Sequence, residues 1–110
     1  MQRAAALILL ALFGCAEEAP LDPQAQLVQR GEKIYLANCI ACHARNPGEA
    51  GPVGPPVAGS SLELLEAKVL RNEYPPGYTP KRDSKAMVPL VHLAPELPAV
   101  AAFLAEDAQE

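Results

Sequence analysis

The sequence predicts an all-α domain, with about three main helices joined by long Pro/Gly-rich loops. Apolar residues recur at helical spacing in three segments: Ala25 to about Asn38, Ser60 to about Asn72, and Pro95 to about Asp107. The segments between them contain 8 of the 12 prolines and 5 of the 7 glycines of the chain, and no alternating strand pattern appears. A chain of 110 residues has room for one domain.

The first helical segment carries Leu27, Gly31, Ile34 and Tyr35 on one face. A glycine inside a helix costs roughly 1 kcal/mol relative to alanine. Gly31 is therefore best explained by another helix that crosses very close to it.

The other two segments show features of helix starts. Ser60-Ser61-Leu62-Glu63 has the pattern of a capping box. In the last segment, Pro95 suits the first turn, whereas Pro98 removes an early hydrogen bond. The regular part of that helix is expected to begin as late as Pro98.

Cys39-Ile40-Ala41-Cys42-His43 follows the first helical segment and has the pattern C-x-x-C-H, which is typical of c-type haem attachment. Two thiols at this spacing can form thioether bonds with the vinyl groups of one haem, and the adjacent imidazole can bind its iron. The alternatives are a redox dithiol or half of a zinc site. A dithiol does not need the histidine, and zinc needs two further ligands, for which the chain offers Cys15 and His92. A haem would also fill the interior of a chain with two phenylalanines and no tryptophan.

The two long loops allow different interpretations. The loop Asn46 to Gly59 can wrap round the edge of a flat cofactor or form a disordered linker. The loop Glu73 to Leu90 contains Lys81-Arg82-Asp83-Ser84-Lys85 just before Met87. This basic cluster is either a docking patch for an acidic redox partner or a solvated loop.

Residues 1–14 are predicted to be an export signal that is removed. Arg3 precedes an apolar run from Ala4 to Phe13, which is too short to span a bilayer. Leu12-Phe13-Gly14-Cys15 resembles a lipobox, so Cys15 is expected to be lipidated and to anchor the protein to a membrane. The alternative is an ordinary signal peptide that leaves a free thiol. Residues 15–24, which are acidic and contain proline, are expected to be a tether before the domain at 25–110.

The charge balance argues against a nucleic-acid partner. The formal net charge is −4, and it becomes −5 from Cys15 onward because Arg3 is the one charged residue before it. A nucleic-acid-binding protein presents a basic face to the phosphates.

Residues 27 to 105 resemble the class I c-type cytochromes. The resemblance lies in Gly31 to His43, in Gly54-Pro55-Pro56-Val57-Ala58-Gly59, which is similar to their G-P-x-x-x-G loop, and in Met87 and the helix that follows. In the family a proline often follows the methionine directly, whereas here Pro89 stands two residues later.

The resemblance implies a cytochrome c fold around one covalently bound haem c. It implies that the first and last helices cross, with Gly31 giving room near Phe103. It also implies His43 and Met87 as axial ligands, with the carbonyl of Pro55 accepting a hydrogen bond from His43 Nδ1. His92 is the alternative sixth ligand.

The predicted function is electron transfer rather than catalysis. After His43 is assigned to iron, the chain offers no Ser-His-Asp set and no phosphate-binding loop. A single-haem carrier located outside the cytoplasm, on the periplasmic side or cell surface, would exchange electrons with proteins of the respiratory chain or an extracytoplasmic oxidoreductase. The alternatives are a haem subunit of a larger oxidoreductase, or a haem domain whose open sixth site binds a small ligand.

Overall fold

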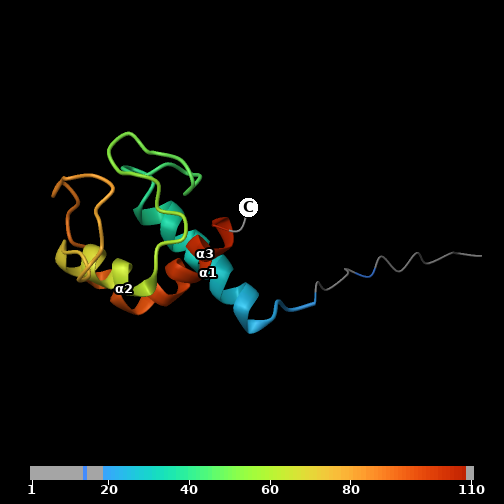
Figure 1. Cartoon of the computed structure of the whole chain (residues 1–110). Helices are drawn as coiled ribbons and strands as arrows, with labels where there is room; N and C mark the ends of the chain where they lie inside the picture. Colours follow the sequence, from blue (N-terminus) through green and yellow to red (C-terminus); the bar gives the residue numbers. More distant parts are fainter. Residues whose placement is uncertain (1–13, 15–18, 109–110) are drawn as a thin grey trace, which may run out of the picture.

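The structure is a computed structural model that describes Gly14 and residues 19–108. The expected lipidation site, Cys15, and all of the expected export signal except Gly14 lie outside the described residues. The helices are α1 (Pro23–Asn38), α2 (Leu62–Leu65), the π-helical segment η1 (Glu66–Leu70), the 3₁₀ segment η2 (Val91–Glu96) and α3 (Leu97–Asp107). The described residues contain no strand, which confirms the all-α prediction (Figure 1).

Helix α1 begins two residues earlier than expected. Asp22 is its N-cap, and the Asp22 carboxylate accepts a hydrogen bond from the backbone N–H of Ala25 at 2.8 Å. Pro23 fits the first turn because the N–H that proline lacks has no partner there. Pro23 and Gln24, which were assigned to the tether, therefore belong to the helix.

Helices α1 and α3 cross closely, as the sequence suggested (Figure 1). Gly31 is buried at the crossing, where a Cβ atom would overlap the carbonyl group of Ala99 and lie 2.9 Å from Cβ of Phe103. The prediction that Gly31 gives room near Phe103 is confirmed.

The second helical segment starts later than predicted and changes its winding. The expected capping box from Ser60 to Glu63 is wrong, because Ser61 is the N-cap and its Oγ accepts the N–H of Leu64 at 3.1 Å. The hydroxyl of Ser60 instead donates to the carbonyl of Val57 at 2.6 Å. After one α-helical turn the segment widens into η1, and Asn72 beyond it has a φ of 53°.

The last helical segment is also divided. Pro95 lies within η2, and α3 begins at Leu97, one residue before the latest expected start. Pro98 occupies the first turn of α3, where its missing N–H costs little.

The core is small and lies where α1, α3 and the α2–η1 segment meet. Its buried members are Tyr35, Leu65, Val69, Leu93, Leu97, Val100 and Leu104. Partly buried residues packed against it include Cys39 and Met87. Among the described residues, none of the helices has the length and apolar character needed to cross a bilayer.

Candidate functional site

The C-x-x-C-H residues form a tight turn that continues directly from α1. The N–H of Cys39 still donates to the carbonyl of Tyr35 at 2.9 Å, and the N–H of His43 donates to that of Cys39 at 2.9 Å. Cys39 is half-buried and Cys42 is exposed, and both are free thiols. Burial, with a smaller contribution from Cys42, raises the pKa of the Cys39 thiol to about 11.

His43 is held by the loop that follows it. Its Nδ1 lies 2.9 Å from the carbonyl oxygen of Pro55. The N–H groups of Val53 and Gly54 both donate to the carbonyl of Cys42, at 3.1 and 2.8 Å. Gly54 packs directly against the imidazole, so that a Cβ atom there would lie 2.5 Å from Nδ1 and 2.9 Å from Nε2. The loop thus fixes the position of the ring and its orientation, in which Nδ1 faces Pro55.

Tyr35 connects α1 to the chain beyond His43. Its side chain is buried, with 1% of its surface exposed, and its hydroxyl donates to the carbonyl of Ala44 at 2.5 Å. Its ring contacts that of Phe103 on α3, with 5.5 Å between centroids. Burial is the main cause that raises the pKa of Tyr35 to about 12.

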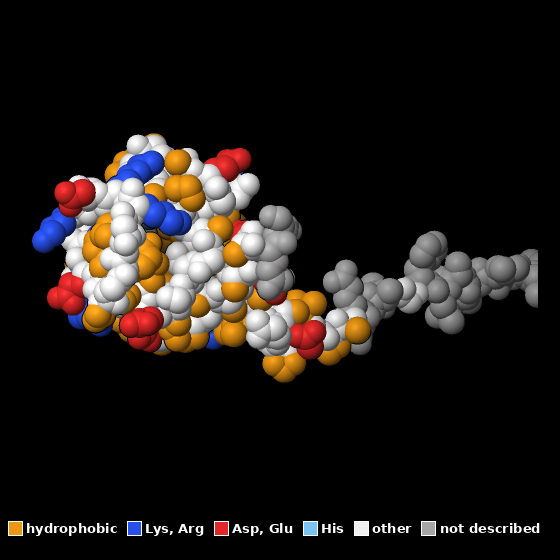
Figure 2. All heavy atoms as spheres, in the orientation of Figure 1, with side chains coloured by type: hydrophobic (Ala, Val, Ile, Leu, Met, Phe, Trp, Pro, Cys, Tyr) orange, Lys and Arg blue, Asp and Glu red, His pale blue; other side chains and the backbone are white. Residues whose placement is uncertain are grey.

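A mostly apolar cavity of about 310 Å³ lies between the helices and the two long loops. This volume falls within the range of about 300–1,000 Å³ typical of small-molecule sites. Its walls include Cys39, Cys42, His43, Pro55 and Met87, which are five of the residues that the sequence pointed to. The cavity opens to the surface, where Figure 2 shows apolar side chains exposed next to Lys and Arg side chains.

The two candidate sixth ligands differ in position. Met87 is half-buried and lines the cavity, whereas His92 is exposed and is not among the residues that line it. The backbone N–H of Leu90 donates to the carbonyl of Val69 at 2.7 Å, which holds the end of the Met87 loop against η1. The structure therefore brings Met87, and not His92, into the same cavity as His43.

A comparison with protein-family models matches residues 26–104 to the family described as cytochrome c oxidase, cbb3-type, subunit III. The chain belongs to this family of c-type cytochrome domains. Comparisons with curated proteins and with solved structures gave no match. This cytochrome domain is therefore an electron-transfer domain, and its family implies a covalently bound haem c.

The residues of this cytochrome domain fit such a group. The cavity is apolar, as a porphyrin ring requires, and it combines two free thiols, an imidazole and a thioether sulfur in its walls. The imidazole has Nδ1 occupied by Pro55, which leaves Nε2 available to a metal. Within the described residues, no group of three or more His, Cys, Asp or Glu is gathered where it could hold a metal ion by itself.

Three features of the site were not identified from the sequence. In the sequence, Gly54 is recognisable only as part of a loop pattern, whereas in the structure it packs directly against the His43 ring. Tyr35 was assigned to a helix face without a role for its hydroxyl. Lys81 and Arg82 were interpreted as a docking patch or solvated loop, but their side chains donate to backbone carbonyls across the cavity mouth. No spacing rule relates these distant partners, so only the fold reveals them.

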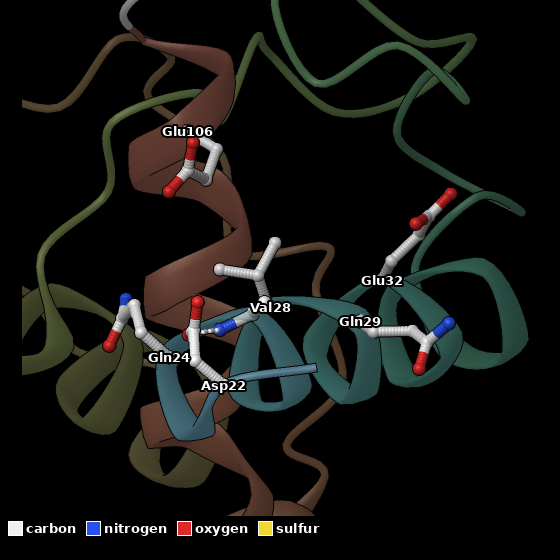
Figure 3. A pocket seen from close by; sticks show the side chains of 7 residues that line it. Asp22, Gln24, Val28, Gln29, Glu32 and Glu106 are labelled. Atoms are coloured by element: carbon white, nitrogen blue, oxygen red, sulfur yellow. Dashed lines mark hydrogen bonds between the residues drawn. The ribbon is translucent and has the colours of Figure 1, made fainter. Parts of the chain in front are cut away.

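A second hollow lies apart from these residues, between the start of α1 and the end of α3 (Figure 3). Its volume is about 500 Å³, and its walls carry the acidic side chains of Asp22, Glu32 and Glu106. Asp22 is already engaged as the N-cap of α1. None of the candidate haem-binding residues lines this hollow.

Proposed function

We propose that this cytochrome domain is a single-haem electron carrier that works outside the cytoplasm. Cys39 and Cys42 would hold the haem covalently, and His43 and Met87 would be its axial ligands. The observation that supports this most strongly is that all four residues line one cavity, with His43 Nδ1 oriented by the carbonyl of Pro55.

Each of these residues would have a separate task. The hydrogen bond to Pro55 keeps the proton on Nδ1 and makes His43 more basic at Nε2. Met87 would complete the ligand set with sulfur, and a Met/His pair raises the reduction potential. The apolar walls, including Leu65, Val69 and Leu97, would exclude water. When bound, the haem supplies a one-electron couple between ferric and ferrous iron.

Covalent attachment can be tested directly. The protein, expressed with haem-attachment machinery, should keep its haem through denaturing electrophoresis and acid–acetone extraction. Loss of colour in either treatment would support the interpretation of Cys39 and Cys42 as a dithiol.

The family description favours a second candidate function, a haem subunit of a larger oxidoreductase. In that case the partners would be the other subunits of a respiratory complex rather than freely diffusing proteins. Purification from membranes in mild detergent distinguishes the two. Co-purification in a stable complex supports the subunit, and recovery of the cytochrome alone supports the free carrier.

A haem domain with an open sixth site would behave differently from either. With His43 and Met87 both bound, the reduced protein should have a low-spin spectrum that carbon monoxide does not change. A carbon monoxide difference spectrum at neutral pH would indicate an open site instead.

We also infer that residues 1–14 are an export signal and that Cys15 is lipidated, with the residues up to Asp22 acting as the tether. The support is the apolar run that ends in Leu12-Phe13-Gly14-Cys15. Each buried CH₂ group of a lipid contributes about 0.8 kcal/mol to membrane binding, so more than one acyl chain is needed for a firm anchor. Mass spectrometry of the membrane fraction should find acylated Cys15 as the first residue. A mature protein that starts elsewhere would contradict this.

A further inference from the structure

Two basic side chains connect the loop that carries Met87 to the loop that carries Pro55. Nζ of Lys81 donates to the carbonyl of Pro56 at 2.8 Å. Nη1 of Arg82 donates to the carbonyl of Val53 at 2.5 Å. Both residues, and both of their partners, line the cavity. The two hydrogen bonds therefore span its mouth.

The loop that carries Met87 makes few other hydrogen bonds to the rest of the domain. Asn72, which precedes the loop, donates through Nδ2 to the carbonyl of Lys85, two residues before Met87, at 3.2 Å, and at the end of the loop the N–H of Leu90 donates to the carbonyl of Val69 at 2.7 Å. Within the described part of the chain, the bonds of Lys81 and Arg82 are the two hydrogen bonds that connect residues 75–84 to a segment outside the loop. Met87 follows this stretch by three residues. Its position over the cavity thus depends on how firmly this stretch is held, in addition to the bond from Asn72 to Lys85.

The partners of Lys81 and Arg82 belong to the segment that fixes His43. Val53 and Pro56 flank Gly54, which contacts the imidazole, and Pro55, which accepts from Nδ1. A charged donor makes a stronger hydrogen bond to a carbonyl than a neutral donor does. The adjacent residues Lys81 and Arg82 consequently join the loop that carries Met87 to the loop that holds His43.

We propose that Lys81 and Arg82 are positioning residues that close the Met87 loop over the cavity and so hold Met87 in place as the sixth ligand. The part concerning Met87 rests on the proposed function. The loop closure itself rests on the two hydrogen bonds. The basic cluster then has a structural task within the domain, whether or not a partner also contacts it.

The test compares two double variants of the full, haem-loaded chain. Lys81→Met/Arg82→Met removes both donors. Lys33→Met/Lys85→Met removes the same charge from an exposed site on α1 and from the same loop, without removing either bond. Both substitutions of the first variant are at exposed positions, so the fold should persist. Lys81→Arg/Arg82→Lys keeps both donors and serves as the rescue.

The first measurement is backbone hydrogen–deuterium exchange, which reports opening of the loop regardless of what binds iron. The hydrogen-bonded amides of the loop, those of Tyr78, Ala86 and Leu90, should exchange about tenfold faster in the first variant than in the wild type, the charge control or the rescue variant. Equal exchange in the first variant and the charge control would overturn the loop closure.

The second measurement is the apparent affinity of ferric protein for imidazole, which competes with the sixth ligand. Affinity should rise about tenfold in the first variant, because a loosened loop lowers the population in which Met87 is bound. Unchanged imidazole affinity together with faster exchange would overturn the positioning of Met87.

A Met87→Ala variant separates the proposed sixth ligand from the proposed role of Lys81 and Arg82. If it binds imidazole no better than the wild type, the proposed ligand itself has failed.

Discussion

At the scale of single residues, the environment of His43 is the most closely determined part of the site. The ring is confined between Gly54, which leaves no room for a side chain, and the carbonyl of Pro55, which accepts from Nδ1. A ligand whose ring orientation is fixed in advance loses little freedom when it binds a metal.

Gly54→Ala should displace the His43 ring, because the new methyl group would overlap it. Overpacking of this kind costs about 1–3 kcal/mol, and here it should also break the bond to Pro55. Urea unfolding and the reduction potential of the loaded protein would measure the two effects. Gly48→Ala is the control, since its Cβ atom would meet only the side chain of Asn46, at 3.3 Å. Equal behaviour of the two variants would contradict the described packing.

Tyr35 should make the stability of the protein depend on alkaline pH. Its pKa is raised from 10.0 to about 12 in the folded state, so the folded protein favours the neutral phenol. That stabilisation is fully present below pH 10 and is lost as pH rises toward 12. In Tyr35→Phe, the fall in unfolding free energy between pH 9 and pH 11 should be smaller than in the wild type. At neutral pH the variant should lose about 1 kcal/mol, because the carbonyl of Ala44 loses its donor. An identical pH dependence in urea unfolding would contradict this account.

At the scale of elements, the fold depends on the crossing of α1 and α3. The C-x-x-C-H turn continues from α1, and α3 supplies Leu97, Val100 and Leu104 to the cavity wall. The ion pair between Arg30 on α1 and Glu96 just before α3 lies next to this crossing, with both hydrogen bonds at 2.6 Å. The distance between the two helices therefore sets the shape of the site.

Gly31→Ala should destabilise the protein even though alanine favours helices by roughly 1 kcal/mol. The added methyl group would overlap the backbone of Ala99, and backbone cannot rotate away as a flexible side chain can. A net loss of about 1–3 kcal/mol is expected in urea unfolding. Gln29→Ala, at an exposed position of the same helix, should change stability little. A stabilised Gly31→Ala protein would mean that the helices do not approach this closely.

The elements also show which features a sequence can predict. The helix positions and the close approach at Gly31 follow from periodicity and composition, whereas the meeting of the C-x-x-C-H turn with the Gly54–Gly59 loop was implied by the resemblance to the class I c-type cytochromes. The π-helical winding of η1 does not, because it depends on how the segment packs in three dimensions. The capping error arose because Ser60 and Ser61 are both good N-cap residues, and only the fold directs Ser60 to Val57. The hydrogen bonds of Lys81 and Arg82 depend on how the two loops fold against each other. No repeating pattern in the sequence indicates this arrangement.

At the scale of the whole molecule, the cavity is large relative to the core around it. At ~24 cal/mol per Å³, leaving about 310 Å³ unfilled would cost on the order of 7 kcal/mol. This is an upper figure because the cavity opens to solvent. It is still comparable with the total stability of a typical domain, which is about 5–15 kcal/mol.

Removal of the attachment sites should therefore unfold most of the domain. Cys39→Ser/Cys42→Ser, which cannot form thioether bonds, is expected to lose most of its helical circular dichroism and its cooperative unfolding transition. Met87→Ala should keep both, because the haem would stay attached. A Cys39→Ser/Cys42→Ser protein as helical and as cooperative as the wild type would show that the chain folds without help from a bound group.

The measurement that tests the central claim most directly is the ligand-to-metal charge-transfer band of Met-ligated ferric haem, recorded in the wild type, Met87→Ala and His92→Ala. Met87 lines the cavity and His92 is exposed. The wild type and His92→Ala should therefore show the band, and Met87→Ala should lose it and bind exogenous ligands. A wild type without the band, in which His92→Ala alone opens the iron, would contradict the account and identify a bis-histidine cytochrome.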